Sequence, residues 1–137
     1  MRAPYTQLYL HLVWATWQRL PLITPDLRQP LYASMQRHLR RLRADVVAIG
    51  GLDDHVHVLL RFPTTVAVAD LVKHAKGGPS HFVTQVLRSP DLFKWQGGYG
   101  AFTVSKRGVP VVREYVLNQE QHHRDGTLIP ALERTEE

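Results

Sequence analysis

The alternation of side chains in residues 55–62, His-Val-His-Val-Leu-Leu-Arg-Phe, places the strictest constraint on this fold. Successive side chains of a strand point to opposite faces of its sheet, so one face of this segment is wholly apolar. That face carries Val56, Val58, Leu60 and Phe62. Such a stripe must pack on helices, so His55 and His57 share the opposite face, which we expect to be the less covered side.

Three further segments are predicted to be strands. Residues 5–16 alternate, with Leu8, Leu10, Leu12 and Trp14 on one side. Residues 45–52 precede the histidine strand and are joined to it near Asp53-Asp54, where acidic residues suit a tight hairpin. Residues 101–105 form the last and shortest strand.

Apolar residues spaced three and four apart predict helices in three places. The first covers residues 26–43, behind Thr24 as N-cap and Pro25. The second covers 66–76 and should end at Gly77-Gly78-Pro79, with a short helix at 80–87 after it. The third runs without a break from 109 to about 123, and Gly126 is placed to stop it. We expect the acidic residues 133–137 to be frayed.

The resulting order is β-α-β-β-α-β-α, and its first six elements match a ferredoxin-like arrangement. The predicted fold is therefore α+β: an antiparallel sheet with helices on one face, an open second face and a C-terminal helix. A chain of 137 residues is the usual size of one domain, so we expect a single domain over 1–137.

The composition says more about the function of the chain than about its fold. The chain has no cysteine, which excludes thiolate metal sites and cysteine nucleophiles, so a bound metal must use histidine, carboxylate or amide ligands. A net charge of +5 suits a polyanion such as nucleic acid. No apolar run is long enough to cross a bilayer and the N-terminus lacks a signal-peptide core, so we expect a cytoplasmic protein.

The two histidines, two apart on one strand face, are close enough to share one metal ion, although two surface histidines would give the same pattern. The last helix offers two further groups. Tyr115 and Gln119 are four residues apart and so are neighbours on a helix. Gln119 has an oxygen that suits a hard ion, and Tyr115 is a candidate nucleophile once a metal lies beside it. A tyrosine that only packs against the core is the alternative.

In combination these residues resemble a known family, the single-tyrosine HUH transposases of small bacterial insertion sequences (the TnpA type) and the related REP-associated tyrosine transposases. HUH denotes a histidine, a bulky apolar residue and a histidine, matched by His55-Val56-His57. The resemblance covers most of the chain. The matching segments are residues 11–16, 54–60, 73–80, 95–102 and 115–119, followed by His122-His123.

The resemblance implies a homodimer that cleaves and rejoins single-stranded DNA next to hairpins, with Mg²⁺ or Mn²⁺ and no nucleotide cofactor. It assigns Tyr115 as the nucleophile that forms a 5′-phosphotyrosine link, in its own subunit or its partner's. It assigns His55, His57 and Gln119 as the metal ligands. Lys73 and Lys76 are expected to contact the DNA backbone, although the run from Lys76 to His81 departs from the family's usual pattern.

Two other functions fit the same residues. One is a passive single-stranded nucleic-acid-binding module, and the other is a metal-dependent nuclease that uses water while Tyr115 is structural. We attribute His122 and His123 to the C-terminal end of the last helix, where positive charge is favourable, and leave them out of the ligand set.

Overall fold

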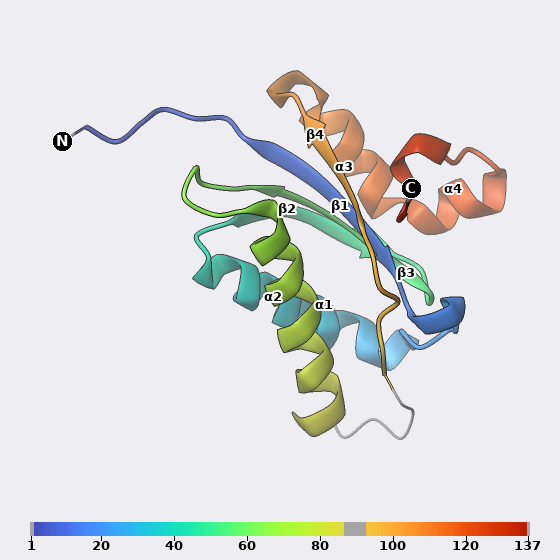
Figure 1. The fold of residues 1–137 in the computed structure, drawn as a ribbon. Helices are drawn as coiled ribbons and strands as arrows, with labels where there is room; N and C mark the ends of the chain where they lie inside the picture. Colours follow the sequence, from blue (N-terminus) through green and yellow to red (C-terminus); the bar gives the residue numbers. More distant parts are fainter. Residues whose placement is uncertain (1, 87–92, 137) are drawn as a thin grey trace.

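A sheet of four antiparallel strands forms the centre of the molecule, and two long helices cover one of its faces (Figure 1). The computed structural model describes residues 2–86 and 93–136. The strands are β1 (Tyr9–Ala15), β2 (Asp45–Gly51), β3 (His55–Arg61) and β4 (Gly100–Val104), in the spatial order β2-β3-β1-β4. The helices are α1 (Pro25–Arg41), α2 (Val68–His81), α3 (Val109–Leu117) and α4 (Gln119–Asp125). The predicted ferredoxin-like order is confirmed.

The main core lies between the sheet and helices α1 and α2. The predicted inward stripes of β1 and β3 both face it, and they pack against apolar side chains of the two helices. The buried strand residues in this core are Leu10, Leu12, Trp14, Val56, Val58 and Leu60. The alternation in the sequence therefore assigned the faces of both strands correctly.

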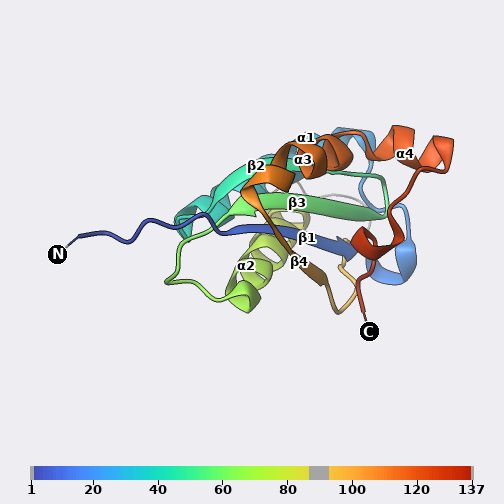
Figure 2. The ribbon, with the colours of Figure 1, turned by 90° about the horizontal axis from the view of Figure 1, so that it is seen from above.

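The sequence predicted an open second face of the sheet, and this prediction is wrong. Helix α3 lies against β2 and β3 (Figure 2). A small second core forms there from Ala48, Leu59 and Val116. Gly50 makes the close approach possible, because a Cβ atom there would lie 1.9 Å from the carbonyl oxygen of Val116. The C-terminal helices thus cover the histidine face.

Helix α2 continues through Gly77, Gly78 and Pro79 to His81, so the predicted break at that point is wrong. Packing against α1 overrides the local preference, since α1 and α2 are in contact and a Cβ atom at Gly78 would lie 2.1 Å from His38 Nε2. A π-helical turn follows (Phe82–Val86). The predicted short helix at 80–87 is thus partly absorbed into α2, and residue 87 lies outside the described residues.

The last predicted helix is divided in two. Asn118 leaves the helical conformation (φ −112°, ψ 33°), and its side-chain amide donates to the carbonyl oxygen of Glu114 at 2.9 Å. Side chains of asparagine compete with the backbone for such carbonyls, which is why this residue ends α3. Gly126 ends α4 in the left-handed conformation (φ 68°), as predicted.

Smaller differences concern element ends. The first strand begins at Tyr9 and not at residue 5, and α1 covers Pro25–Arg41 where a helix over 26–43 was predicted. In the part of the chain that the structure describes, no helix is both long and apolar enough to cross a membrane.

Candidate active site

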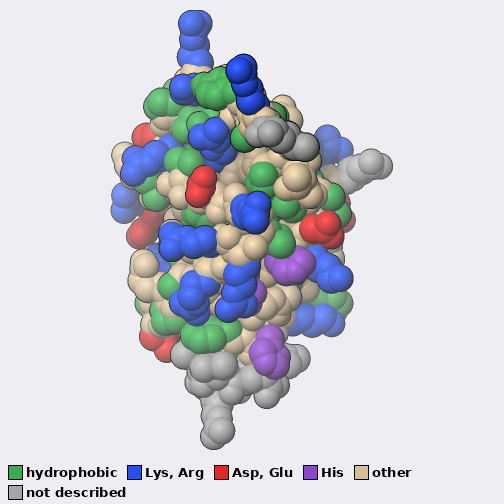
Figure 3. Space-filling model, turned by 90° about the vertical axis from the view of Figure 1, so that its left-hand side faces the viewer, with side chains coloured by type: hydrophobic (Ala, Val, Ile, Leu, Met, Phe, Trp, Pro, Cys, Tyr) green, Lys and Arg blue, Asp and Glu red, His purple; other side chains and the backbone are tan. Residues whose placement is uncertain are grey.

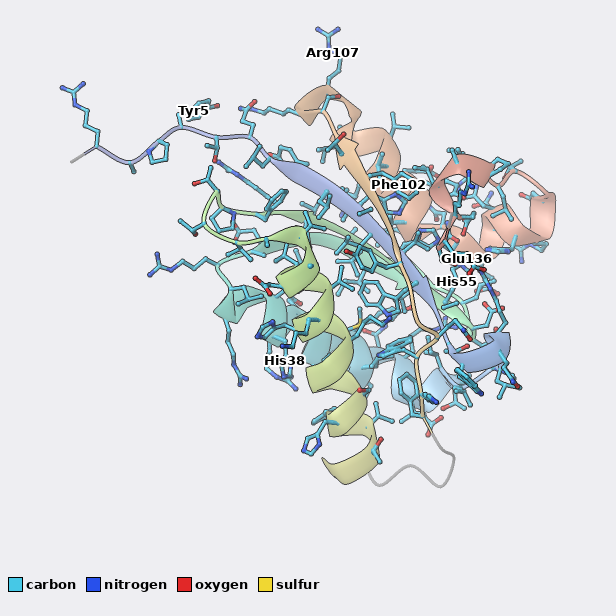
Figure 4. All side chains as sticks on the ribbon, in the orientation of Figure 1. Tyr5, His38, His55, Phe102, Arg107 and Glu136 are labelled. Carbon is cyan, nitrogen blue, oxygen red and sulfur yellow. The ribbon has the colours of Figure 1, made fainter. Side chains whose placement is uncertain are left out.

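His55 and His57 lie side by side on β3, with ring centroids 5.1 Å apart. Their shared face is as predicted, but their exposure is not: the two side chains are 1% and 0% exposed. The cover comes from α3, α4 and the C-terminal segment, residues 127–136. Figure 4 labels His55, the first residue of β3. The site is a buried cluster and not an open platform.

The far nitrogen of each imidazole is held by another side chain. The Nδ1–H of His55 donates to Asp54 Oδ1 at 2.7 Å, and this bond lowers the pKa of the Asp54 carboxyl. His57 Nδ1 lies 2.8 Å from His11 Nε2 on β1. Both Nε2 atoms are thereby turned toward the same space. The sequence did not indicate that His11 and Asp54 bond to the imidazoles, although His11 falls on the same sheet face and Asp54 directly precedes the pair.

Gln119 brings an oxygen to the histidines. Its side-chain Nε2 donates to the carbonyl oxygen of Tyr115 at 3.1 Å, which leaves Oε1 facing His55 Nε2 at 3.1 Å. The predicted pairing of Tyr115 and Gln119 therefore exists. It forms across the boundary between α3 and α4 and not within one continuous helix.

The phenol of Tyr115 lies in the same cluster of the same chain. Its ring centroid is 5.8 Å from that of His57, and the side chain is 2% exposed. The hydroxyl donates to Glu133 Oε1 at 2.5 Å and accepts from the backbone N–H of Ile129 at 3.1 Å. Burial, together with the bond to Glu133, raises the pKa of Tyr115 to about 12, so the resting phenol is protonated.

Glu133 is the main residue that sequence analysis missed. The expectation that residues 133–137 are frayed is wrong for Glu133, whose Oε2 lies 3.0 Å from His57 Nε2 and 3.7 Å from His55 Nε2. Burial opposes its ionisation, but the bond and charge of His57 and the bond from Tyr115 lower the pKa of Glu133 to about 2. No periodicity in this irregular segment could have placed the side chain; residue 137 lies outside the described residues.

His122 and His123 also reach the cluster, which corrects their assignment to a helix end alone. His123 Nε2 lies 3.2 Å from Gln119 Oε1, and the ring is 5.0 Å from that of His55. The ring of His122 packs against Tyr115 at 4.8 Å between centroids. Both residues border the site.

Lys73 and Lys76 do not enter this cluster. Lys73 is exposed on α2. Lys76 is partly buried, and its ammonium donates to the carbonyl oxygens of Gln96 at 2.9 Å and Gly98 at 3.2 Å. Burial lowers the pKa of Lys76.

The donor atoms of the cluster suit a divalent cation. The donor atoms of His55, His57 and Glu133 all lie within 4.8 Å of one another. When His55 is neutral and its Nδ1–H donates to Asp54, its Nε2 is a lone-pair acceptor, yet it faces the acceptor Oε1 of Gln119. Converging acceptors with no hydrogen between them favour a cation, and imidazole, amide and carboxylate groups are all donors to divalent metals in proteins.

The fold and the cluster together define a ferredoxin-like domain with a buried tyrosine next to a potential metal site. A sequence model described as "Transposase IS200 like" matches residues 4–119, which is most of the chain. The protein belongs to the IS200-like transposase family.

Known proteins agree with that assignment. The chain is 25% identical over 124 residues to the ISDra2 transposase TnpA of Deinococcus radiodurans, and the match covers 87% of each protein. It superposes on the crystal structure of a putative transposase from D. radiodurans R1 with a TM-score of 0.67, at 26% identity, covering 87% of this chain and 95% of that one. A REP-associated tyrosine transposase bound to a REP hairpin shares the fold, with a TM-score of 0.63 at 14% identity, covering 93% of this chain and 74% of that one.

Proposed function

We propose that residues 1–137 act as one catalytic domain, a metal-dependent transposase that cuts and rejoins single-stranded DNA next to hairpins. The observation that supports it most is the meeting of Tyr115, His55, His57 and Gln119 in one buried cluster of an IS200-like chain. The activity is DNA transposition through a 5′-phosphotyrosine intermediate, with Tyr115 as the nucleophile of this HUH site.

His55, His57 and Gln119 would hold Mg²⁺ or Mn²⁺. A divalent ion held there would stabilise the negative charge on the phosphate oxygens in the transition state. Tyr115 remains protonated at neutral pH because its pKa is about 12, so the phenol must release its proton as it attacks. The ring of His57 lies 5.8 Å from that of Tyr115, and Gln119 Nε2 donates to the backbone oxygen of Tyr115.

The reaction exchanges one phosphodiester for another of similar energy. The Tyr115 oxygen forms a bond to phosphorus, the bond from phosphorus to the 3′ oxygen breaks, and that oxygen leaves as a 3′-hydroxyl after taking up a proton. A 3′-hydroxyl then attacks the phosphotyrosine and restores the phenol. Because the number of phosphoester bonds is unchanged, no nucleotide cofactor is needed.

Single-stranded DNA with a hairpin is the proposed substrate. The charge of +5 and the many Lys and Arg side chains on the face shown in Figure 3 support binding to a polyanion. The REP-associated relative was solved with a REP hairpin, which supports the same kind of ligand here. Lys73 and Lys76 are the proposed backbone contacts, with Lys73 the more exposed.

We also propose that the protein is a homodimer that works in the cytoplasm, where its DNA substrate lies. Strand β4 is at the edge of the sheet with Ala101 and Thr103 exposed, and Val111 and Leu117 on α3 are exposed apolar side chains. Edges and apolar surface of this kind favour association. Light scattering would report a dimeric mass.

One experiment tests the nucleophile. Labelled single-stranded hairpin DNA is incubated with the protein and Mn²⁺, and the products are run on a denaturing gel. We expect a covalent protein–DNA adduct that is absent from Tyr115→Phe, because the phenyl ring has no oxygen to attack phosphorus. Tyr32→Phe is the matched control: this half-buried tyrosine on α1 also has a raised pKa, of about 12, and should keep the adduct.

The water-using nuclease is the second candidate, because the Tyr115 hydroxyl is already occupied by Glu133 and Ile129. Cleavage without any adduct would favour it and would contradict the transposase. Tight DNA binding with neither cleavage nor adduct would leave only a passive binding module.

A further inference from the structure

We infer that Glu133 is a further metal ligand, and that its carboxylate joins the metal site to the nucleophile through its two oxygens. The inference rests on the proposed function, since it concerns the same metal. It extends the site from the sheet and α3–α4 to the C-terminal segment, which the sequence pattern had left outside.

The first support is position. Glu133 Oε2 lies 3.0 Å from His57 Nε2 and 3.7 Å from His55 Nε2, and the donor atoms of the three residues lie within 4.8 Å of one another. Among residues 2–86 and 93–136, this is the one group of three or more histidine or acidic side chains arranged in that way. The side chain of Glu133 is 16% exposed, so its carboxylate points inward.

The second support is charge. His55, His57 and Gln119 offer neutral donors, whereas Mg²⁺ and Mn²⁺ bind most strongly where at least one ligand is a carboxylate. Asp54 cannot readily take that part, because its carboxylate is engaged by the Nδ1 of His55, on the far side of the ring from Nε2. Glu133 supplies the negative charge that the three other donors lack.

The third support is the way the C-terminal segment is held. The backbone N–H of Ile129 donates to the Tyr115 hydroxyl, and residues 130–132 form a 3₁₀ turn just before Glu133. Beyond Glu133 the backbone packs on glycine: a Cβ atom at Gly100 would lie 2.0 Å from the Arg134 carbonyl oxygen. The segment is seated on both sides of Glu133, so the carboxylate is placed by packing and not by chance.

The two oxygens of Glu133 have separate partners. Oε2 faces the imidazoles, while Oε1 accepts the hydrogen bond from the Tyr115 hydroxyl at 2.5 Å. A single carboxylate would therefore link the phenol to a metal ion bound by the imidazoles. Glutamine at this position would keep the shape and lose the charge.

The test measures metal binding by the full chain without DNA. Mn²⁺ is titrated into the protein, and free Mn²⁺ is followed by its electron paramagnetic resonance signal. We expect Glu133→Gln to weaken Mn²⁺ binding by more than about tenfold, because even the loss of an outer partner of a metal ligand costs about 10–100-fold. Glu136→Gln is the matched control, because Glu136 is exposed in the same segment and should bind Mn²⁺ as the unmodified chain does. Glu133→Asp keeps a carboxylate and should retain more affinity than Glu133→Gln.

Unchanged Mn²⁺ affinity in Glu133→Gln, with circular dichroism showing a folded protein, would overturn the inference. So would faster DNA cleavage by that variant with unchanged Mn²⁺ affinity, since Glu133 would then only cover the site. Neither outcome contradicts the proposed function, because that function is contradicted by the absence of a Tyr115–DNA adduct and not by the Mn²⁺ titration.

Discussion

His11 and Asp54 bind no metal in the proposed site, yet they determine which nitrogen each imidazole presents. For His57 Nε2 to face an ion, its proton must be on Nδ1, which then donates to His11 Nε2 at 2.8 Å. His11 is fully buried, and within the described residues its own Nδ1 has no hydrogen-bond partner. A buried polar atom without a partner is costly, so the bond to His57 is the evident role of this side chain.

The role of His11 predicts the effect of His11→Phe. The ring is of similar size, but the acceptor for His57 Nδ1–H is lost, so Mn²⁺ affinity should fall by about 10–100-fold, as is usual when a histidine ligand loses its outer partner. The Mn²⁺ titration without DNA measures this. His11→Gln retains a side-chain acceptor and should recover part of the affinity. Equal affinity in His11→Phe and the unmodified chain would contradict the role.

At the scale of single residues, the sequence predicted the members of the buried cluster that lie on strands and helices. His55 and His57 follow from strand alternation, and the neighbourhood of Tyr115 and Gln119 follows from helical spacing. Glu133 does not, because it comes 18 residues after Tyr115 in an irregular segment, and no repeat relates the two. Such a partner depends on the path of the chain through space, which only tertiary packing fixes.

The contact between α3 and the sheet depends on one position in β2. A Cβ atom at Gly50 would come within 1.9 Å of the backbone oxygen of Val116, the residue next to Tyr115. Backbone cannot yield as a flexible side chain does, so any larger residue there must push α3 away. Tyr115, the proposed nucleophile on this helix, would then move with it.

We therefore expect Gly50→Ala to lower the free energy of unfolding by about 1–3 kcal/mol, the usual cost of overpacking. Gly50→Ala should also form less adduct than the unmodified chain under conditions where both proteins are fully folded. Gly77→Ala is the control, since Gly77 lies within α2 with nothing within 4 Å of an added Cβ atom.

In that control, alanine should raise the free energy of unfolding by about 0.5–1 kcal/mol, because it favours a helix interior over glycine. Urea denaturation measures both changes. Equal stabilities for Gly50→Ala and the unmodified chain would mean that α3 is not seated as described.

The elements that sequence analysis misjudged share one physical cause. Gly77, Gly78 and Pro79 read as a break, yet contact with α1 carries α2 across them. Asn118 was predicted to lie within a helix, yet its side chain donates to the Glu114 carbonyl oxygen and α3 ends there. Helix propensity differs by at most about 0.7 kcal/mol among ordinary residues and is about 1 kcal/mol less favourable for glycine than for alanine, which packing or a single side-chain bond can outweigh.

At the scale of the whole molecule, the structure brings the proposed nucleophile and ligands together within one chain. Tyr115 lies against His57 of its own sheet, and Gln119 and Glu133 reach the same pair of imidazoles. A dimer would then contain two complete sites, and neither would require the tyrosine of the other subunit.

This arrangement predicts the behaviour of mixed subunits. Tyr115→Phe and His57→Ala chains, each with a different affinity tag, are co-expressed and purified through both tags. Each subunit then lacks one part of its own site, so no adduct should form. Light scattering on the same sample confirms that it is dimeric. An adduct on the His57→Ala chain would show instead that tyrosines are shared between subunits.

The overall architecture was more predictable than its outer layer. The alternation of β1 and β3, with two amphipathic helices between strands, specified the ferredoxin-like order and the buried face. The same patterns left the histidine face open, since α3 and the C-terminal segment bury little apolar area and bind the cluster through polar contacts. Polar contacts of that kind have no periodic signature in a sequence.

Lys76 shows how this packing affects the interpretation of a basic residue. Its ammonium fastens the loop at Gln96 and Gly98, and its carbonyl accepts from Trp95 Nε1. The same loop leads to Gly100, on which the backbone next to Glu133 rests. Lys76→Ala would therefore weaken DNA binding even if Lys76 never touched DNA. The salt dependence of DNA affinity reports the number of displaced counterions, so it would distinguish a lost phosphate contact from a loosened loop.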